Sequence, residues 1–303
     1  EVIAVPDPLI QGVDLVEHFP IRGGVLGRIL GHVKAVDSVS IDIMDGEILA
    51  LVGESGCGKS TLGRLLVGSL LPDSGQLYFE GKSVTEFDGT EKRDARKARQ
   101  MIFQDPSASL NPRKSVRSIL SQSLLLNQVT HGRVETAKKI EDILDSVDLT
   151  PHNVFLDRFP HELSGGQRQR LSIARAISVN PRFIVADEPV ASLDISIRSQ
   201  ILKLMLDLQR HFGLTYLFIT HDLRLVRSLA DRIAVMYLGK IVEMGKADEI
   251  CANPKHPYTE ALLTATPIPD PKASKSRSRV KLRGEPPSAV SPPSGCRFRT
   301  RCQ

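Results

Sequence analysis

The stretch Leu163-Ser164-Gly165-Gly166-Gln167 is the most informative part of this sequence, because two other short motifs accompany it in a fixed order. A glycine-rich loop, Gly53-Glu54-Ser55-Gly56-Cys57-Gly58-Lys59-Ser60, lies far upstream. A pair of acids, Asp187-Glu188, follows an apolar run a short way downstream. The glycine-rich loop alone would fit many proteins, and the order of the three motifs is what narrows the fold.

The glycine-rich loop matches the pattern G-x-x-x-x-G-K-[ST] in full. It follows an expected strand, Glu47–Val52, and it opens an expected helix at Lys59. Glycines let backbone N–H groups turn inward around phosphates, and the positive end of the helix adds to the attraction. We expect Lys59 to reach the β- and γ-phosphates, Ser60 to bind Mg²⁺ and Thr61 to bond an α-phosphate oxygen. A chance glycine turn is the alternative, which the flanking elements disfavour.

The acid pair ends an apolar strand that begins at Arg182. Asp187 is expected to hold Mg²⁺ through water, and Glu188 to polarise the attacking water. Taken alone, the two acids would be interpreted as a helix cap. The strand that precedes them and Pro189 after them favour the functional interpretation.

Ser164, Gly165 and Gly166 precede an expected helix, Gln167–Ser178. Small residues permit close backbone approach and a helix N-terminus attracts anions, so this stretch predicts a second γ-phosphate site. Because a helical insert carries it away from the glycine-rich loop, we expect a head-to-tail pair of chains, each capping the ATP of its partner. The alternative is a simple helix N-cap at Ser164 after a flexible turn.

Three single residues complete the candidate site. Gln104 follows the short expected strand Met101–Phe103 and can bond Mg²⁺ or the attacking water. His221 ends the expected strand Thr215–Thr220, at the edge where open α/β sheets bind ligands, although a lone histidine is more often structural. Asp194 either contacts the opposite chain or caps the helix that starts at Ile195, and the two roles are compatible.

The pattern of strands and helices predicts an α/β fold. Strands expected at Phe183–Ala186, Thr215–Ile219 and Ile233–Tyr237 alternate with helices, which indicates a mainly parallel sheet covered on both sides. Two β-rich segments near the start, Gln11–His18 and Val33–Met44, indicate an antiparallel part, with a glycine-rich insert at Ile21–Gly31 between them. Helical spacing dominates from Ser115 to Arg158. One further amphipathic helix has the apolar residues Ile197, Ile201, Leu204, Leu208 and Phe212 on one face.

Charge is distributed unevenly along the 303 residues. Residues 266–303 hold nine Lys or Arg and two Asp or Glu, a charge of +7, so the rest of the chain has a charge of −2. The net charge of +5 therefore belongs to the tail and does not indicate a basic face for nucleic acid. Residues 266–294 are rich in Pro, Ser, Lys and Arg and predict an extended or mobile linker. No apolar run approaches the ~18 residues of a membrane span.

With these motifs the chain resembles the nucleotide-binding subunit of ABC transporters over about residues 10–265. By that likeness, Gly53–Thr61 is the Walker A loop, Gln104 the Q-loop glutamine and Leu163–Gln167 the signature motif. Asp187 and Glu188 are then Walker B, Ala191–Asp194 the D-loop and His221 the switch histidine, while Phe19 is the best candidate to stack on adenine. The resemblance implies an ABC-type P-loop ATPase with ATP and Mg²⁺. The fold implied by the resemblance has a mainly parallel sheet core, an antiparallel β subdomain, a helical subdomain at about 113–180 and a C-terminal tail. The implied domains are 1–265, which binds the nucleotide, and the extension 266–303.

Other segments resemble the oligopeptide/dipeptide importer branch, among them Gln104-Asp105-Pro106, Ser109–Arg113 and Asn253–Thr259. Relatives in this branch also import nickel, glutathione or small sugars. The likeness implies a second ATPase subunit, identical or paralogous, two transmembrane permease subunits and, indirectly, an extracytoplasmic substrate-binding protein. It also implies a place on the cytoplasmic face of the cell membrane and no nucleic-acid partner.

The segment Gly295–Cys302 resembles the C-terminal cysteine motif of the branch, at which some members bind a [4Fe–4S] cluster. A cluster normally needs four ligands, and this segment offers Cys296 and Cys302. Either more cysteines follow a trimmed end or the site is vestigial.

Three other functions compete with import. A soluble ABC-type ATPase that acts on DNA or ribosomes is disfavoured, because the sequence has no long coiled-coil insertion and no second cassette. An exporter subunit is disfavoured by the importer-branch segments. A small-molecule kinase would use the loop at Gly53 but would not need Leu163–Gln167.

Overall fold

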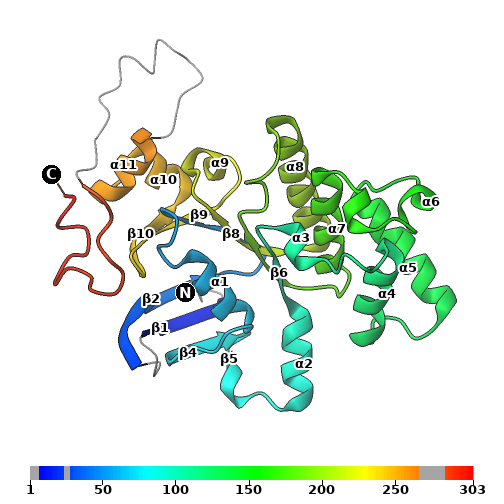
Figure 1. The fold of residues 1–303 in the computed structure, drawn as a ribbon, viewed down its shortest axis with the longest axis horizontal. Helices are drawn as coiled ribbons and strands as arrows, with labels where there is room; N and C mark the ends of the chain where they lie inside the picture. Colours follow the sequence, from blue (N-terminus) through cyan, green and yellow to red (C-terminus); the bar gives the residue numbers. More distant parts are fainter. Residues whose placement is uncertain (1–6, 24–27, 266–283, 303) are drawn as a thin grey trace, which may run out of the picture. The chain divides into compact units, whose positions relative to one another are not determined.

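The structure is a computed structural model that describes residues 7–23, 28–265 and 284–302 (Figure 1). These residues fall into two compact units. The first draws on Glu1–Glu86 and Leu217–Gln303, and the second is Phe87–Tyr216. The boundary between them falls within strand β8 (Thr215–Thr220), whose side chains are all buried.

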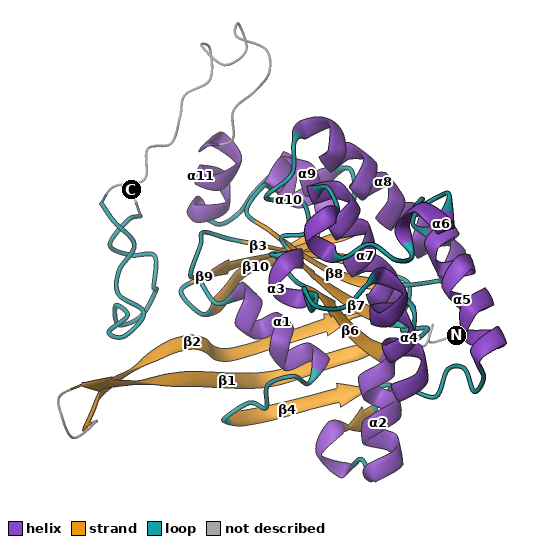
Figure 2. Cartoon of the chain, turned by 45° about the vertical axis from the view of Figure 1, so that its right-hand side comes forward, coloured by secondary structure: helices purple, strands orange, loops and turns teal. Residues whose placement is uncertain are grey.

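The first unit contains an antiparallel sheet with the strand order β2-β1-β4-β5. Figure 2 shows β1, β2 and β4 side by side, with long β1 and β2 forming a hairpin. In β2, Val39, Ile41 and Ile43 are buried while Ser40 is exposed, which is the period of two expected for a strand with one face on the core. The strands are β1 (Ile10–Gly23), β2 (Arg28–Ile43), β4 (Ser74–Phe79) and β5 (Lys82–Ser83).

In the glycine-rich insert expected at Ile21–Gly31, residues 21–23 and 28–31 are strand, so that part of the prediction was wrong, and residues 24–27 lie outside the described residues. Ile21 pairs with Gly31, and Gly23 pairs with Arg28, so cross-strand pairing continues to the last described residue of each strand. Glycine weakens a strand but does not forbid one when a partner strand supplies the hydrogen bonds.

A second group of strands in the first unit leads to the phosphate-binding loop. Strand β3 (Ile48–Val52) is buried at every residue, as its uninterrupted apolar sequence predicts, and it lies parallel to β9 (Arg232–Tyr237). Strand β10 (Lys240–Lys246) pairs with β9 in the antiparallel sense. The helices of this unit are α1 (Lys59–Val67), η1 (Val84–Glu86), α9 (Leu223–Arg227), α10 (Ala247–Ala252) and α11 (Pro257–Ala265).

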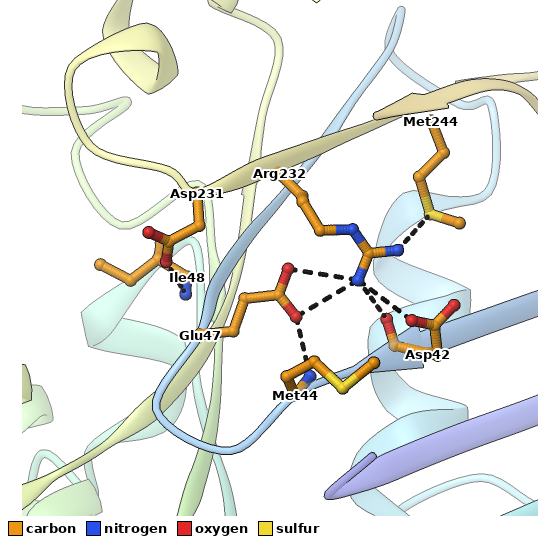
Figure 3. Close-up of polar contacts among 7 residues, drawn as sticks. All are labelled: Asp42, Met44, Glu47, Ile48, Asp231, Arg232 and Met244. Carbon is orange, nitrogen blue, oxygen red and sulfur yellow. Dashed lines mark hydrogen bonds and ion pairs between the residues drawn. The ribbon is translucent and has the colours of Figure 1, made fainter. Parts of the chain in front are cut away.

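A cluster of charged groups fixes the start of β3 (Figure 3). The backbone N–H of Ile48 donates to the carboxylate of Asp231 at 2.8 Å. Arg232 donates to Asp42 at 3.0 Å and to Glu47 at 3.3 Å, so it joins the end of β2 and the beginning of β9 to the beginning of β3. Burial raises the pKa of Glu47 above its ordinary value, although Arg232 acts in the opposite direction. The carboxylate of Glu47 therefore depends on this arginine.

The second unit begins with α2 and contains two parallel strands, β6 and β7. Ile102 at the end of β6 pairs with Ala186 near the end of β7, so both strands end at the same edge. Helices α4, α5 and α7 pack together, as Figure 1 shows, and they confirm the helical character expected from Ser115 onward. The elements are α2 (Gly89–Ala98), β6 (Arg99–Ile102), α3 (Pro106–Ser109), α4 (Val116–Leu126), α5 (Arg133–Ser146), α6 (His152–Phe155), η2 (Pro160–Glu162), α7 (Gly165–Ile177), β7 (Phe183–Asp187) and α8 (Ile195–Phe212).

Helix α8 buries Ile201, Leu204 and Leu208 as its apolar stripe predicts, but Phe212 at its last turn is 48% exposed. Within the described ranges, no helix is both long and apolar enough to cross a lipid bilayer.

The C-terminal segment, residues 284–302, differs from the linker that its composition predicts up to residue 294. The backbone N–H of Lys34 in β2 donates to the carbonyl of Ala289 at 3.1 Å, and Phe298 is 2% exposed. A composition rich in proline and serine does not reveal that a single aromatic residue anchors the segment. Residues 266–283 lie outside the described residues.

We predict that Arg232→Ala lowers the free energy of unfolding by about 3 kcal/mol, because it leaves the buried carboxylate of Glu47 without its cation. Urea denaturation at pH 7 measures this loss. The loss should shrink as the pH falls through the raised pKa of Glu47, since the protonated carboxyl needs no cation.

Arg227→Ala is the control in the same unit, because Arg227 and its partner Asp248 are 60% and 89% exposed. It should cost less than about 1 kcal/mol. Equal, small losses for the two variants would contradict the structural role given to Arg232.

Candidate active site

The phosphate-binding loop depends on two glycines that pack against neighbouring backbone. A Cβ atom at Gly53 would overlap the carbonyl oxygen of Met236 and would lie 2.8 Å from the sulfur of Cys57. A Cβ atom at Gly58 would overlap the carbonyl oxygen of Ala35, and Gly58 has a positive φ of 110° that favours glycine. The loop can therefore turn tightly between β3 and α1 only with glycine at both positions.

Lys59 stands at the first position of α1 and is held by its own loop. Its ammonium donates to the carbonyl oxygen of Gly53 at 2.8 Å and to that of Glu54 at 3.0 Å, and the residue is 5% exposed. Ser60 and Thr61 follow it on the first turn of the helix. A hydroxyl oxygen is a ligand that suits Mg²⁺, and a neighbouring ammonium group suits the negative charge of phosphate.

Cys57 lies inside the loop and is 4% exposed. Burial raises the pKa of its thiol, and the nearby charge of Lys59 only partly opposes that rise. The thiol is therefore protonated at neutral pH and has no nucleophilic character.

In the second unit, the expected catalytic groups Gln104 and Glu188 meet. The side-chain amide of Gln104 donates to the carboxylate of Glu188 at 3.3 Å. Gln104 follows β6 and Glu188 follows β7, so the shared edge of two parallel strands brings them together. Asp187, 5% exposed, ends β7 and offers a carboxylate of the kind that binds Mg²⁺ directly or through water.

Glu188 has an unusual backbone conformation, with φ of +43°. A residue with a side chain rarely occupies this region, and such strain of about 1–3 kcal/mol concentrates at functional sites. The backbone N–H of Ala191 donates to the carbonyl of Glu188 at 3.2 Å and helps to hold the turn.

The stretch Leu163–Gln167 forms the start of α7. Ser164 is the N-cap, its hydroxyl accepts from the N–H of Gln167 at 3.3 Å, and the side chain of Gln167 accepts from the N–H of Ser164 at 2.9 Å. The N-cap interpretation is therefore correct, and it does not exclude anion binding. A capping box uses the N–H of Gln167, while those of Gly165 and Gly166 point out of the helix end.

Gly166 also has a packing role that the sequence did not reveal. A Cβ atom there would lie 2.8 Å from the side chain of Ile197 in α8, so glycine allows α7 and α8 to approach closely. Asp194 occupies the N-cap position of α8, where its carbonyl accepts from the N–H of Arg198 at 2.8 Å. Its side chain makes no capping bond and is exposed.

The two other predicted site residues belong to the first unit. His221 directly follows β8 and is exposed. Phe19 lies on β1 opposite Val33 and is 40% exposed, an aromatic surface of the kind on which a base can stack.

The sequence motifs missed the residues that hold Glu54 in the loop. The N–H of Glu54 donates to the hydroxyl of Tyr258 at 2.8 Å, and its carboxylate accepts two hydrogen bonds from Arg301. Both partners lie in segments that carry the branch resemblance, but nothing in their spacing indicates that they contact the loop.

Cys296 and Cys302 do not fit a [4Fe–4S] cluster. Neither cysteine forms a disulfide, both are exposed, and among the described residues no group of three or more His, Cys, Asp or Glu side chains could hold a metal. A cluster needs four ligands, so no chemistry is assigned to these two cysteines.

Curated relatives cover nearly the whole chain. The oligopeptide transport ATP-binding protein AppF of Bacillus subtilis is 49% identical over 98% of this chain and 89% of its own length. The dipeptide transport ATP-binding protein DppF of Escherichia coli is 47% identical over 98% of this chain and 87% of its own length.

Solved structures confirm the α/β cassette fold. CbiO1 of Clostridium perfringens, described as part of an ABC transporter complex, superposes with a TM-score of 0.67 and 28% identity over 82% of this chain and 92% of its own. A dimeric structure of MJ0796, a bacterial ABC transporter cassette, gives a TM-score of 0.67 and 26% identity over 78% of this chain and 98% of its own.

We predict that Gly53→Ala weakens ATP binding by about tenfold or more, because the new Cβ must push the loop away from Met236 and Cys57. Isothermal titration calorimetry with Mg²⁺ and ATP measures the change. Gly89→Ala is the matched control, since a Cβ at Gly89 would meet nothing within 4 Å. Unchanged ATP affinity in a folded Gly53→Ala protein would show that the close packing of the loop is irrelevant to binding.

Two family models match the chain along most of its length. The ABC transporter family matches residues 36–191, and the C-terminal region of the oligopeptide/dipeptide transporter family matches residues 242–303. The first match spans the phosphate-binding loop and the Asp187–Glu188 pair, and the second includes the contacts to Glu54. The chain therefore belongs to the ABC transporter family, as an ATP-binding and ATP-hydrolysing subunit of the oligopeptide/dipeptide transporter branch.

Proposed function

We propose that this chain hydrolyses ATP in sites shared by two ATPase subunits and thereby powers the import of dipeptides or oligopeptides. The observation that carries the hydrolytic part is the contact between Gln104 and Glu188 at 3.3 Å, at the ends of adjacent parallel strands. A carboxylate held by an amide at such an edge can orient a water molecule and accept its proton.

Each residue of the phosphate-binding loop has a defined part in this proposal. Lys59 exchanges its contacts with Gly53 and Glu54 for the β- and γ-phosphates, while Ser60 and Thr61 contact Mg²⁺ and the α-phosphate. Ser60, Asp187 and Gln104 would hold Mg²⁺, since all three offer oxygen ligands, and the metal would neutralise charge on the phosphates. His221 would bond the γ-phosphate and help to orient Glu188.

The second half of each ATP site comes from the partner subunit in this proposal. The helix end at Ser164–Gly166 is an anion site that the capping box leaves open to a phosphate. The exposed carboxylate of Asp194 would contact the opposite subunit, and Phe19 would stack on adenine. The dimeric cassette MJ0796 supports this arrangement by analogy, and the partner here is an identical chain or a paralogue.

The contact with the permease subunits is proposed at the second unit. A pocket of about 280 Å³ lies beside the loop that follows Gln104, between that loop and helix α4. ATP-driven closure would pull on two transmembrane subunits there, at the cytoplasmic face of the membrane, while an extracytoplasmic binding protein delivers the substrate. The pocket is lined by Ser109, Asn111, Lys114, Ile119, Gln122, Ser123, Leu126, Asn127 and Arg175.

The substrate class rests on the names of the relatives. AppF and DppF are named for oligopeptide and dipeptide transport, and the C-terminal family match has the same description. Nickel, glutathione and small sugars are the competing cargoes within the branch, and a soluble ABC ATPase outside transport is the competing function. The division into a nucleotide-binding domain at 1–265 and an extension at 266–303, with no nucleic-acid partner, belongs to the same proposal.

We predict that Glu188→Gln abolishes uptake of a labelled dipeptide, because the amide cannot accept a proton from the attacking water. ATP hydrolysis should fall by about 100-fold or more, while ATP binding persists. The variant replaces the wild-type chain in cells of the source organism, and uptake is compared with that of labelled nickel, glutathione and a disaccharide.

Gly89→Ala at the start of helix α2 is the matched control for expression and assembly, since a Cβ atom there would meet nothing within 4 Å. Loss of nickel, glutathione or sugar uptake with normal dipeptide uptake would overturn the peptide assignment. Rapid ATP turnover by Glu188→Gln would overturn the role of Glu188.

A further inference from the structure

The C-terminal segment, residues 284–302, reaches the phosphate-binding loop through Arg301. The guanidinium of Arg301 donates to both carboxylate oxygens of Glu54, at 2.9 and 3.2 Å. Arg301 has only 6% of its side chain exposed, while Glu54 has 29% exposed. Burial opposes the charge of Arg301, but its hydrogen bonds to Glu54 outweigh burial and raise its pKa above the usual value. This fork is a two-point contact that fixes the direction of the Glu54 side chain.

Glu54 is held at three points, each by a different part of the first unit. Its carboxylate meets Arg301, its N–H donates to the hydroxyl of Tyr258 at 2.8 Å, and its carbonyl accepts from Lys59 at 3.0 Å. Tyr258 is completely buried, so the hydroxyl is a fixed acceptor. Glu54 therefore both contacts the C-terminal segment and helps to position the ammonium of Lys59.

The segment has its own anchors next to this contact. Phe298 is 2% exposed and packs against Tyr237, Tyr258 and His256, with ring centroids 5.4–5.6 Å apart. Arg297 donates to the carbonyl of Leu238 and pairs with the carboxylate of Asp37. An aromatic anchor and a buried ion pair hold the backbone firmly enough for Arg301 to act as a fixed charge.

Charge explains why the loop needs this partner. Glu54 places a carboxylate in a loop whose task is to surround the phosphates of ATP, and like charges at short range repel. The arginine cancels that charge without occupying the loop, because it reaches Glu54 from the C-terminal segment. Without Arg301 the carboxylate would oppose the phosphates and would also be free to move.

We propose that Arg301 is a positioning residue for ATP, which acts through Glu54 to neutralise the phosphate-binding loop and fix its shape. The C-terminal extension of the chain is then a working part of the nucleotide site of its own subunit. This inference rests on the proposed function, since it takes the Gly53–Thr61 loop as the site of the phosphates.

The test measures the Kd and KM for ATP with Mg²⁺ in the full chain that carries Arg301→Gln. Both values should rise by about tenfold at low salt, while kcat stays within about twofold of the wild-type value. The deficit should shrink at about 0.5 M NaCl, since salt screens the repulsion between a partly exposed carboxylate and phosphate. A purely structural role for Arg301 would lower kcat through loss of active protein and would leave KM unchanged.

Arg299→Gln is the charge-matched control, because it removes one positive charge from the same segment at an exposed side chain. Its KM should equal that of the wild type. The double variant Glu54→Gln/Arg301→Gln should recover most of the lost affinity, because it removes the carboxylate that the arginine neutralises. Arg301→Lys keeps the charge but loses the fork, and its KM should lie between the values for wild type and Arg301→Gln.

Two outcomes separate this inference from the proposed function. If Lys59→Ala binds ATP normally, the loop is not the phosphate site and the proposed function is wrong. If Lys59→Ala loses ATP but Arg301→Gln keeps the wild-type KM, only the role of Arg301 is overturned. If Arg301→Gln does not fold, Arg301→Lys and the double variant are compared with the wild type. An unchanged KM in Arg301→Lys, together with a KM in the double variant about tenfold above the wild-type value, overturns the role as well.

Discussion

The attraction between phosphate and the N–H groups at a helix end is the interaction on which the rest of this chain depends. In the proposed function, two helices serve it. Helix α1 begins directly after Gly58, and α7 begins after Ser164 with two glycines in its first turn. A helix end attracts an anion only from the front and over a short range, so both ends must face the same polyphosphate to act together. In the proposed function, α1 of one subunit and α7 of its partner supply the two ends.

The shape of the phosphate-binding loop is fixed by groups that lie outside the loop. The carbonyl oxygens of Met236 and Ala35 occupy the space that side chains at Gly53 and Gly58 would need. Hydrogen bonds from the N–H of Ile48 to the carboxylate of Asp231 and from the N–H of Asp231 to the carbonyl of Ile48 hold the strand that leads into the loop. Tyr258 and Arg301 hold Glu54 within it. These supports come from Ala35 before the loop and from residues 231–301 near the end of the sequence, so the loop can keep its shape only when the whole first unit is folded.

The sequence predicts the elements that carry the nucleotide motifs better than it predicts the residues that hold those motifs in place. Periodicity and glycine patterns were enough for β3, α1, β7 and the helices from Ser115 onward, since burial and local turn chemistry decide these elements. The sequence indicates separate roles for Gln104 and Glu188 and does not predict their contact, which the structure shows where two adjacent parallel strands end at one edge. The fork between Arg301 and Glu54 could not be predicted, because 247 positions separate the partners and neither has a local pattern. The burial of Phe298 could not be predicted for a similar reason, since a single aromatic ring holds a segment whose composition is otherwise polar.

The sharing of each ATP between two subunits is tested most directly by the rate of hydrolysis as a function of protein concentration. Purified chain is assayed at saturating ATP from concentrations at which light scattering finds monomers to those at which it finds dimers. The account predicts that the turnover rate per chain rises steeply with concentration and levels off when dimers predominate. A turnover rate per chain that is constant through this range, with full activity in the monomer, would contradict it.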